Sequence, residues 1–427
     1  MLDGPVSKGD QRSWPAAGIC RAPYWIYEDP AIYLREQQRI FGGAAWSYVG
    51  LEVEVPRPGD FKRTFVGEQS VVLVRDAHGE LGAVVNRCAH RGIEFCRSER
   101  GHAKRFVCPY HQWVYDLRGN LLGVPFRRGM RGRGGMPDDF APAENSLQKL
   151  RVESHRGVVF ATYDERTPPF AEYLGASMLH YFERLFDGRQ LVVLGNSRQL
   201  IPCNWKLVLE NSKDPYHATL LHTFLVTFGL FRADQKSEVR LDPTGRHAAL
   251  TSRRGDQSPS EHTAEMMSFK SSYKLHDPRL LDPVKEFPDD TTVVMQTLFP
   301  NLILQQQSNT LALRQIVPRG PSETELIWTF FGYEGDDEAM TERRLRQANL
   351  MGPAGLVSLD DGEVLKAAQE GARLAGERAA LAEMGGRTWE DSDYMVTEAA
   401  LRGFYQYYQK VMELPAERCR EVAHEHR

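Results

Sequence analysis

The stretch from Asn211 to His222 contains residue types that can hold a metal ion, namely Asp214, His217 and His222. Asp214 suits the N-cap of a helix and Pro215 its first position, so we expect a helix to begin here and to carry both histidines. The two histidines are five residues apart, which turns the second imidazole about 100° beyond the i,i+4 position unless the helix bends or widens. Two imidazoles and one distant carboxylate would leave open positions on Fe(II) for O₂ chemistry. The alternative is an ordinary helix whose histidines bind no metal.

A second group of metal-binding residue types lies upstream, in two short segments. Cys88-Ala89-His90 and Cys108-Pro109-Tyr110-His111 each offer one thiolate and one imidazole. Such a set can hold a [2Fe–2S] cluster with cysteines on one iron and histidines on the other. The rival is a Cys₂His₂ zinc site, although zinc-finger spacing keeps like ligands together. The mixed spacing therefore favours the cluster.

Size and composition are those of an ordinary soluble protein with two or three domains. The 427 residues are 41% hydrophobic and 26% charged, and the net charge of −4 provides no basic field for nucleic acid or for an anionic membrane. No apolar run reaches membrane-spanning length, and the first residues lack the apolar core of a signal peptide. Six cysteines are too few for a disulfide scaffold. We therefore expect a cytoplasmic protein that binds neither nucleic acid nor membrane.

The pattern of apolar residues changes near residue 165. Short β-rich runs bounded by turn residues fill the region from residue 46 to residue 160, which predicts a small all-β domain. Beyond it, helical pieces near residues 170–186 and 204–228 precede strands in an antiparallel, meander-like order, which predicts an α+β domain. These strands are expected at residues 247–252, 291–297, 302–307, 310–317 and 324–333, and helices follow at residues 341–349 and 359–374.

The two metal motifs together resemble those of the large (α) subunit of Rieske non-haem iron aromatic-ring hydroxylating oxygenases, and the similarity covers about residues 20–413. Four further stretches are similar to the branch that includes salicylate 5-hydroxylase and terephthalate dioxygenase large subunits, with the salicylate 5-hydroxylases nearer. They run from Val124 to Pro137, from Glu210 to Asp214, from Gln347 to Leu350 and from Gly352 to Gly355.

The resemblance implies an α+β fold of three parts. Residues 1–40 would be an extension packed on the catalytic domain, and residues 41–162 an all-β Rieske [2Fe–2S] domain. Residues 163–427 would be a helix-grip (START-like) catalytic domain, in which a curved antiparallel sheet wraps around a long helix and holds a mononuclear Fe(II). The family pattern places the third iron ligand, beside His217 and His222, at Asp361. Asp360 is the alternative, since carboxylates at a helix start are also ordinary capping partners.

No dinucleotide fingerprint and no P-loop is present, so we expect electrons to arrive from another protein. The resemblance implies an NAD(P)H-dependent reductase, with or without a ferredoxin, which passes single electrons to the Rieske cluster. It also implies a small β subunit in an α₃β₃ assembly, where a Rieske histidine of one subunit meets the iron site of its neighbour. Asp214 is the expected link, because its carboxylate can accept a hydrogen bond from His217 and from that Rieske histidine, His90 or His111.

The branch resemblance suggests a benzoate-type acid as substrate, most of all salicylate, hydroxylated at its 5-position to gentisate. Arg314 lies among apolar residues of an expected strand, where a guanidinium can clamp a carboxylate, although an exposed or internally paired arginine fits the pattern equally well. The rival activity is cis-dihydroxylation of terephthalate, benzoate or anthranilate. A rival of another class is a zinc-stabilised binding protein. Four glutamines of the expected strands can add hydrogen bonds to a phenol, but the sequence does not show which face of the sheet each one occupies. They are Gln305, Gln306, Gln307 and Gln315.

Overall fold

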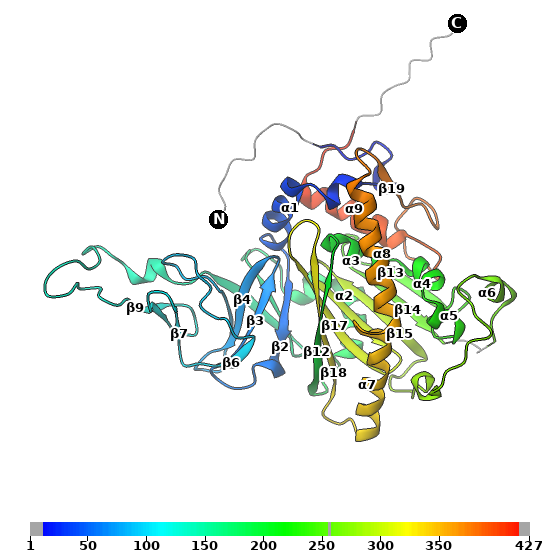
Figure 1. Ribbon diagram of the computed structural model, residues 1–427, viewed down its shortest axis with the longest axis horizontal. Helices are drawn as coiled ribbons and strands as arrows, with labels where there is room; N and C mark the ends of the chain where they lie inside the picture. Colours follow the sequence, from blue (N-terminus) through cyan, green and yellow to red (C-terminus); the bar gives the residue numbers. More distant parts are fainter. Residues whose placement is uncertain (1–11, 255–257, 418–427) are drawn as a thin grey trace, which may run out of the picture.

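Two large antiparallel sheets and the helices around them make up this protein (Figure 1). The computed structural model describes residues 12–254 and 258–417. The first sheet lies on the left of Figure 1, and the second lies at the centre with most of the helices. The α+β class expected from the sequence is therefore confirmed.

The first sheet has seven strands in the order β2-β11-β10-β5-β4-β3-β6, and a three-stranded sheet β7-β8-β9 accompanies it. The larger sheet consists of β2 (Ser47–Leu51), β3 (Asp60–Val66), β4 (Gln69–Arg75), β5 (Leu81–Val85), β6 (Arg100–His102), β10 (Lys149–His155) and β11 (Val158–Thr162), and the smaller of β7 (Phe106–Val107), β8 (Val114–Tyr115) and β9 (Leu121–Gly123). The Cys88 loop follows β5, and the Cys108 loop connects β7 to β8. Both cysteines belong to one apolar core of this part of the chain.

The second sheet has seven strands in the order β12-β18-β17-β16-β15-β14-β13. They are β12 (Leu191–Ile201), β13 (Ser237–Leu241), β14 (Ala248–Arg253), β15 (Thr291–Leu298), β16 (Leu302–Gln307), β17 (Thr310–Pro318) and β18 (Thr324–Tyr333). All five strands expected here are present. The sequence reading missed β12 and β13, which form the two edges of the sheet. The residues of β12 between its two ends are only partly buried or exposed, and a run from Gly195 to Gln199 interrupts its apolar residues, so its apolar pattern is weak.

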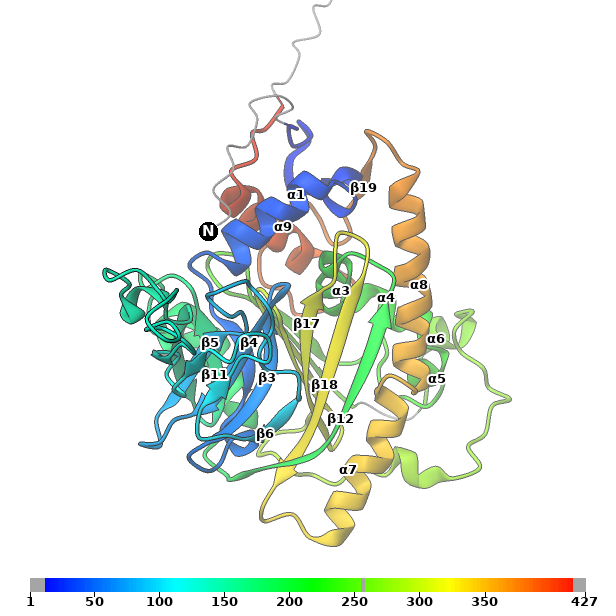
Figure 2. The same ribbon diagram turned by 60° about the vertical axis from the view of Figure 1, so that its left-hand side comes forward.

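The helices divide between the two faces and the edge of this sheet. They are α1 (Pro30–Glu36), α2 (Phe170–Leu185), α3 (Trp205–Lys213), α4 (Pro215–Leu221), α5 (Thr223–Thr227), α6 (Glu261–Glu265), α7 (Glu338–Met351), α8 (Leu356–Arg373) and α9 (Ala399–Met412), and a short pair β1 (Arg21–Pro23) and β19 (Ala379–Leu381) joins distant segments. Figure 2 shows α7 and α8 running along the sheet beside β12. None of the helices in the described ranges is long and apolar enough to span a membrane.

Glutamine side chains show which elements cover which face of the second sheet. Gln296 donates to the carbonyl of Met178 in α2, and Gln315 donates to the carbonyl of Tyr48 in β2. One face of the sheet therefore packs on α2 and on the first sheet, in an apolar core that they share. The opposite face meets α3, α4 and α8, so the helices that carry the predicted metal ligands lie over it.

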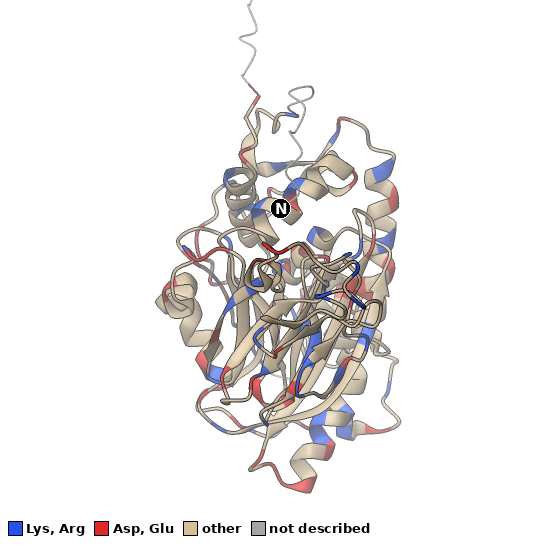
Figure 3. Ribbon diagram, turned by 90° about the vertical axis from the view of Figure 1, so that its left-hand side faces the viewer, with Lys and Arg blue, Asp and Glu red and all other residues tan. Residues whose placement is uncertain are grey.

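Charges are mixed on the side that carries the first sheet, where Lys and Arg alternate with Asp and Glu (Figure 3). A loop on this side contains Arg127, Arg128, Arg131 and Arg133, and one of these arginines contacts another part of the same loop region. Arg127 donates to the carbonyl of Phe140 at 3.1 Å and lies over the ring of the same residue.

Candidate active site

His217 lies in the short helix α4, and His222 lies at the break between α4 and α5. Asp214 caps α4, since its Oδ1 accepts hydrogen bonds from the backbone N–H of Tyr216 at 2.8 Å and of His217 at 3.3 Å. The helix ends at Leu221, and His222 has φ −83° and ψ 81°, outside the helical region, before α5 begins. The expected cap is confirmed, but the expectation that one helix carries both histidines is wrong, because the helix ends before His222 instead of bending or widening.

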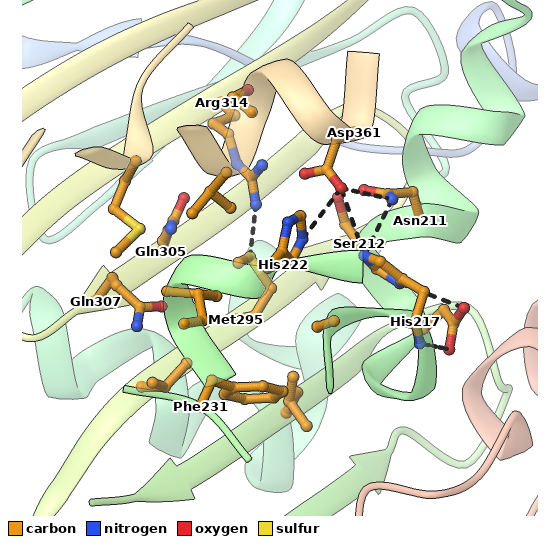
Figure 4. Close-up of a pocket in the computed structure, with 18 residues that line it drawn as sticks. Asn211, Ser212, His217, His222, Phe231, Met295, Gln305, Gln307, Arg314 and Asp361 are labelled. Carbon is orange, nitrogen blue, oxygen red and sulfur yellow. Dashed lines mark hydrogen bonds and ion pairs between the residues drawn. The ribbon is translucent and has the colours of Figure 1, made fainter. Parts of the chain in front are cut away.

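Asp361 brings a carboxylate from α8 to the two imidazoles (Figure 4). Its Oδ1 lies 3.4 Å from Nε2 of His217 and 3.3 Å from Nε2 of His222. One ligand atom from each of these three residues lies within 4.8 Å of the others, a spacing that can hold a metal ion. Two neutral imidazoles and one carboxylate on one side of an ion are the donor set that suits Fe(II) with open positions, so the residues present fit the group.

Each imidazole meets a different carboxylate at its other nitrogen. Nδ1 of His217 lies 3.3 Å from Asp214, and Nδ1 of His222 lies 3.4 Å from Asp360. Carboxylates in this position hold a metal-binding imidazole in one tautomer and orientation. Asp360 is also more exposed than Asp361, with side-chain exposures of 42% and 13%. The geometry therefore favours Asp361 over Asp360 as the third ligand.

The carboxylates and imidazoles of this cluster shift each other's pKa values toward the charged forms. Burial alone would raise the pKa of Asp361, but hydrogen bonds with His217 and His222 outweigh it and hold that pKa below its ordinary value. Burial would lower the pKa of His217, yet Asp214 and Asp361 raise it to about 9. The cluster thus attracts positive charge strongly, and a bound metal cation would replace the protons on the imidazoles.

Asn211 is a site residue that the sequence reading did not assign. From the last turn of α3, its Nδ2 lies 3.1 Å from Oδ1 of Asp361 and 3.2 Å from Nε2 of His217. A polar amide one turn before the capping Asp214 was the only signal in the sequence. Its position lets it hold two of the three candidate ligands.

A pocket opens from this cluster toward the second sheet, and Arg314 lies in its polar part. Arg314 is 6% exposed, and its guanidinium contacts Met295 and lies over the ring of Trp328. Among the described residues no carboxylate forms an ion pair with it; the attraction of Asp361 acts only at longer range. Burial lowers the pKa of Arg314 to about 10, so it remains a cation at neutral pH. Arg314 is therefore not exposed, and within residues 12–254 and 258–417 it has no carboxylate partner.

The Cys88 and Cys108 loops bring a second set of metal-binding residue types near one another. Both thiols are buried, and the rings of His90 and His111 meet with centroids 4.5 Å apart. Nδ1 of His90 is buried and has no hydrogen-bond partner among the described residues. Burial also raises the pKa of the Cys108 thiol, which would favour a protonated sulfur unless a metal binds it. Two buried thiols, two adjacent imidazoles and an unsatisfied ring nitrogen fit a cluster bound by two cysteines and two histidines.

Two family descriptions match this sequence. Residues 45–133 match the Rieske [2Fe-2S] domain, and residues 174–414 match the catalytic domain of the ring hydroxylating α subunit. The chain belongs to the ring-hydroxylating oxygenase α subunits. It is 51% identical to the large oxygenase component of salicylate 5-hydroxylase from a Ralstonia species, over 96% of this chain and 98% of that protein. It is also 45% identical to the anthranilate 1,2-dioxygenase large subunit of Burkholderia cepacia, over 92% and 93%.

The fold of this ring-hydroxylating α subunit matches a solved relative. Naphthalene 1,2-dioxygenase from a Rhodococcus species superposes with a TM-score of 0.76 at 25% identity, covering 92% of this chain and 94% of that one. The protein is thus a Rieske non-haem iron oxygenase, which confirms the enzyme class and its two cofactors, a [2Fe–2S] cluster and a mononuclear iron. A zinc-stabilised binding protein was the wrong alternative. The domain limits at residues 41–162 and 163–427 stay a prediction.

Proposed function

We propose that this protein is the oxygenase component that hydroxylates salicylate at its 5-position and releases gentisate. Support comes from the 51% identity to a salicylate 5-hydroxylase component over nearly the whole of both chains. Within the pocket, the proposed ligands of the mononuclear iron are His217, His222 and Asp361. The proposed ligands of the Rieske cluster are Cys88, His90, Cys108 and His111. When bound, these groups supply electron storage and O₂ activation.

One observation carries the choice of an aromatic acid: Arg314 is buried in the pocket beside the iron site, with no carboxylate paired to it among the described residues. A buried cation without a carboxylate partner is costly, and a benzoate-type acid brings the missing carboxylate. The planar guanidinium can hold that carboxylate through two hydrogen bonds, which fixes the direction of the ring. Leu225, Phe231 and Val293 form part of the apolar wall, which excludes water from the ring.

Asp214 is proposed to connect the two metal sites. Its carboxylate lies 3.3 Å from Nδ1 of His217 while it caps α4, so its negative charge is placed beside one of the proposed iron ligands. In the proposed α₃β₃ assembly with a small β subunit, this carboxylate also receives the ring N–H of His90 or His111 from the neighbouring α subunit. Electrons reach the cluster from an NAD(P)H-dependent reductase, directly or through a ferredoxin.

The test is reconstitution with a reductase and NAD(P)H, followed by identification of products from substituted benzoates. Gentisate from salicylate is the expected product. A cis-diol from terephthalate, benzoate or anthranilate, with no gentisate, would establish the alternative dioxygenase activity, for which the 45% identity to an anthranilate dioxygenase subunit is the supporting observation.

The carboxylate clamp has its own test. Replacing Arg314 by Ala is expected to raise the KM for salicylate at least about tenfold, because a charge-assisted hydrogen-bonded pair is lost. An unchanged KM would remove Arg314 from substrate binding.

A further inference from the structure

Two glutamines on β16 present unsatisfied polar atoms to the active-site pocket. Gln305 and Gln307 line the pocket and are 3% and 4% exposed. Oε1 of Gln305 and Nε2 of Gln307 are buried and have no hydrogen-bond partner among the described residues. Figure 4 shows both side chains beside the pocket that Arg314 and His222 also line. Buried amide atoms are normally paired, so these two are available to a ligand.

Gln306 on β16 and Gln315 on β17 face away from the pocket and form hydrogen bonds with other parts of the fold. Gln306 accepts from Arg184 at 3.0 Å and donates to the carbonyl of Thr291 at 3.2 Å. Gln315 donates to the carbonyl of Tyr48 at 2.9 Å. Gln306 and Gln315 thus point to the face opposite Gln305 and Gln307, and this assigns the faces that the sequence left open.

Strand register places the polar groups of the pocket face in a fixed order. Arg314 on β17 pairs with Ile303 on β16. Gln305 is two residues beyond Ile303 on the same face, which makes it a diagonal neighbour of Arg314, within reach of long side chains. Gln307 lies a further two residues along the strand, about 7 Å beyond Gln305. A carboxylate held by Arg314 therefore has Gln305 as the nearer amide and Gln307 as the farther one.

We propose that Gln305 determines specificity by accepting a hydrogen bond from a donor group ortho to the substrate carboxylate. The inference rests on the proposed function, in which Arg314 holds that carboxylate, and it names the substrate class: benzoates with an ortho O–H or N–H. The ring places an ortho substituent close to its carboxylate, so only the nearer amide can reach it. Gln305 acts on binding and orientation, and takes no part in electron or oxygen transfer.

The test compares salicylate with benzoate, which lacks the ortho donor. Calorimetry on the anaerobic, iron-loaded oxygenase gives the Kd of each acid, and product formation gives kcat/KM. In the Gln305→Leu variant the preference for salicylate over benzoate is expected to fall about tenfold in both measurements, while the values for benzoate change less than twofold. Anthranilate, with an ortho N–H donor, is expected to lose affinity as salicylate does.

Gln307→Leu is the matched control, because it makes the same change on the same strand and the same pocket face. Its salicylate preference is expected to stay within about twofold of the wild-type ratio. The spectrum of the Rieske cluster and the iron content report whether each variant has folded. If Gln305→Leu does not fold, Gln305→Met removes the same acceptor with a similar side-chain volume, and the same fall in preference is expected.

Two results would overturn the inference. If a folded Gln305 variant keeps the wild-type preference for salicylate over benzoate, Gln305 does not contact the ortho group. If Gln307→Leu lowers this preference as much as Gln305→Leu does, recognition of the ortho group does not depend on Gln305 alone. Both leave the proposed function intact, because the wild-type enzyme still converts salicylate. If the wild-type enzyme neither binds nor converts any of the three acids, the proposed function fails and this inference fails with it.

Discussion

Asp360 and Asp361 are adjacent in sequence, yet they contact different nitrogen atoms of the His222 ring. Successive residues of a helix point about 100° apart, so only one of the two carboxylates can reach the point where the Nε2 atoms converge. Asp361 does so, and Asp360 meets Nδ1 of His222 from the other side. The family pattern chose Asp361, whereas residue type and position alone could not, because both residues are carboxylates near a helix start.

Replacing Asp361 by Ala is expected to remove the mononuclear iron, because one of the three ligands, and the only carboxylate among them, is lost. The visible spectrum and the EPR signal of the Rieske cluster should remain as in the wild type. Metal analysis beside these spectra checks the result. Asp360→Ala is the matched control: it is expected to weaken iron binding about 10–100-fold and still to fill with iron at saturation. Full iron retention in the Asp361 variant would show that the third ligand is another residue.

Replacing Asp214 by Asn is expected to keep both metal centres and to abolish electron flow between them. Asn is as good an N-cap as Asp, so α4 should form and stability should change by less than about 1 kcal/mol. What disappears is the negative charge 3.3 Å from Nδ1 of His217. Stopped-flow measurement of cluster oxidation after mixing the reduced enzyme with substrate and O₂ checks this, with an expected loss of at least about 100-fold. Normal coupled turnover would remove Asp214 from the electron path.

At the scale of elements, the sequence was informative where a local signal existed. The cap at Asp214, the apolar strands β14 to β18 and the helix that carries Asp361 all have such signals, and all are present. For His222 the five-residue spacing indicated a distortion, but it did not indicate that the helix ends there. The polar faces of β16 and β17 were equally undetermined: alternation separates Gln305 from Gln306, but only the register and the neighbouring layers decide which of them faces the pocket.

Two glycines show how closely α9 approaches the turn between β13 and β14. A Cβ on Gly403 would lie 2.6 Å from Leu241 Cδ2 and 3.2 Å from the Cα of Gly245. Gly245 itself has φ +80°, and a Cβ there would lie 2.4 Å from the carbonyl oxygen of Gly403. Helix and turn are therefore in backbone contact, and neither position leaves room for a side chain.

Gly403→Ala is therefore expected to destabilise the protein by about 1–3 kcal/mol through overpacking, although Ala is the better helix former by about 1 kcal/mol. Gly371→Ala in α8 is the matched control, since nothing lies within 4 Å of the added Cβ, and a gain of up to about 1 kcal/mol is expected there. Urea denaturation of both variants measures the difference. If Gly403→Ala is as stable as Gly371→Ala, α9 can move away from the turn at little cost in free energy.

At the scale of the whole molecule, a buried polar cluster joins segments that are far apart in the sequence. Glu210 in α3 accepts hydrogen bonds from Tyr27 near the N-terminus at 2.9 Å and from Tyr405 in α9 at 2.9 Å. One helical turn away, Lys206 pairs with Glu36 of α1 at 2.6 Å. Figure 1 shows α1 and α9 lying together above the second sheet. No local pattern predicts partners nearly 200 residues apart, so this cluster could not be predicted from the sequence.

Glu210 makes the stability of the protein depend on pH. Burial raises the pKa of Glu210 to about 7 from an ordinary value of 4.5, although Tyr27, Tyr405 and Lys206 act in the opposite direction. Between these two values the folded protein holds a proton that the unfolded chain has released. Stability due to Glu210 is therefore present at low pH and lost as pH rises from about 4.5 to 7, by about 3 kcal/mol in total.

Glu210→Gln is expected to remove this loss, because the amide can still bond both tyrosine hydroxyls but does not titrate. Relative to the wild type, the variant should therefore be more stable at pH 8 than at pH 5, by about 2–3 kcal/mol in the difference of unfolding free energies. Urea denaturation of both proteins at the two pH values measures it, with Glu390→Gln as a surface control for the loss of one charge. A pH dependence that is the same in wild type and Glu210→Gln would mean that Glu210 is ionised in the folded state, and that Lys206 and the two tyrosines outweigh its burial.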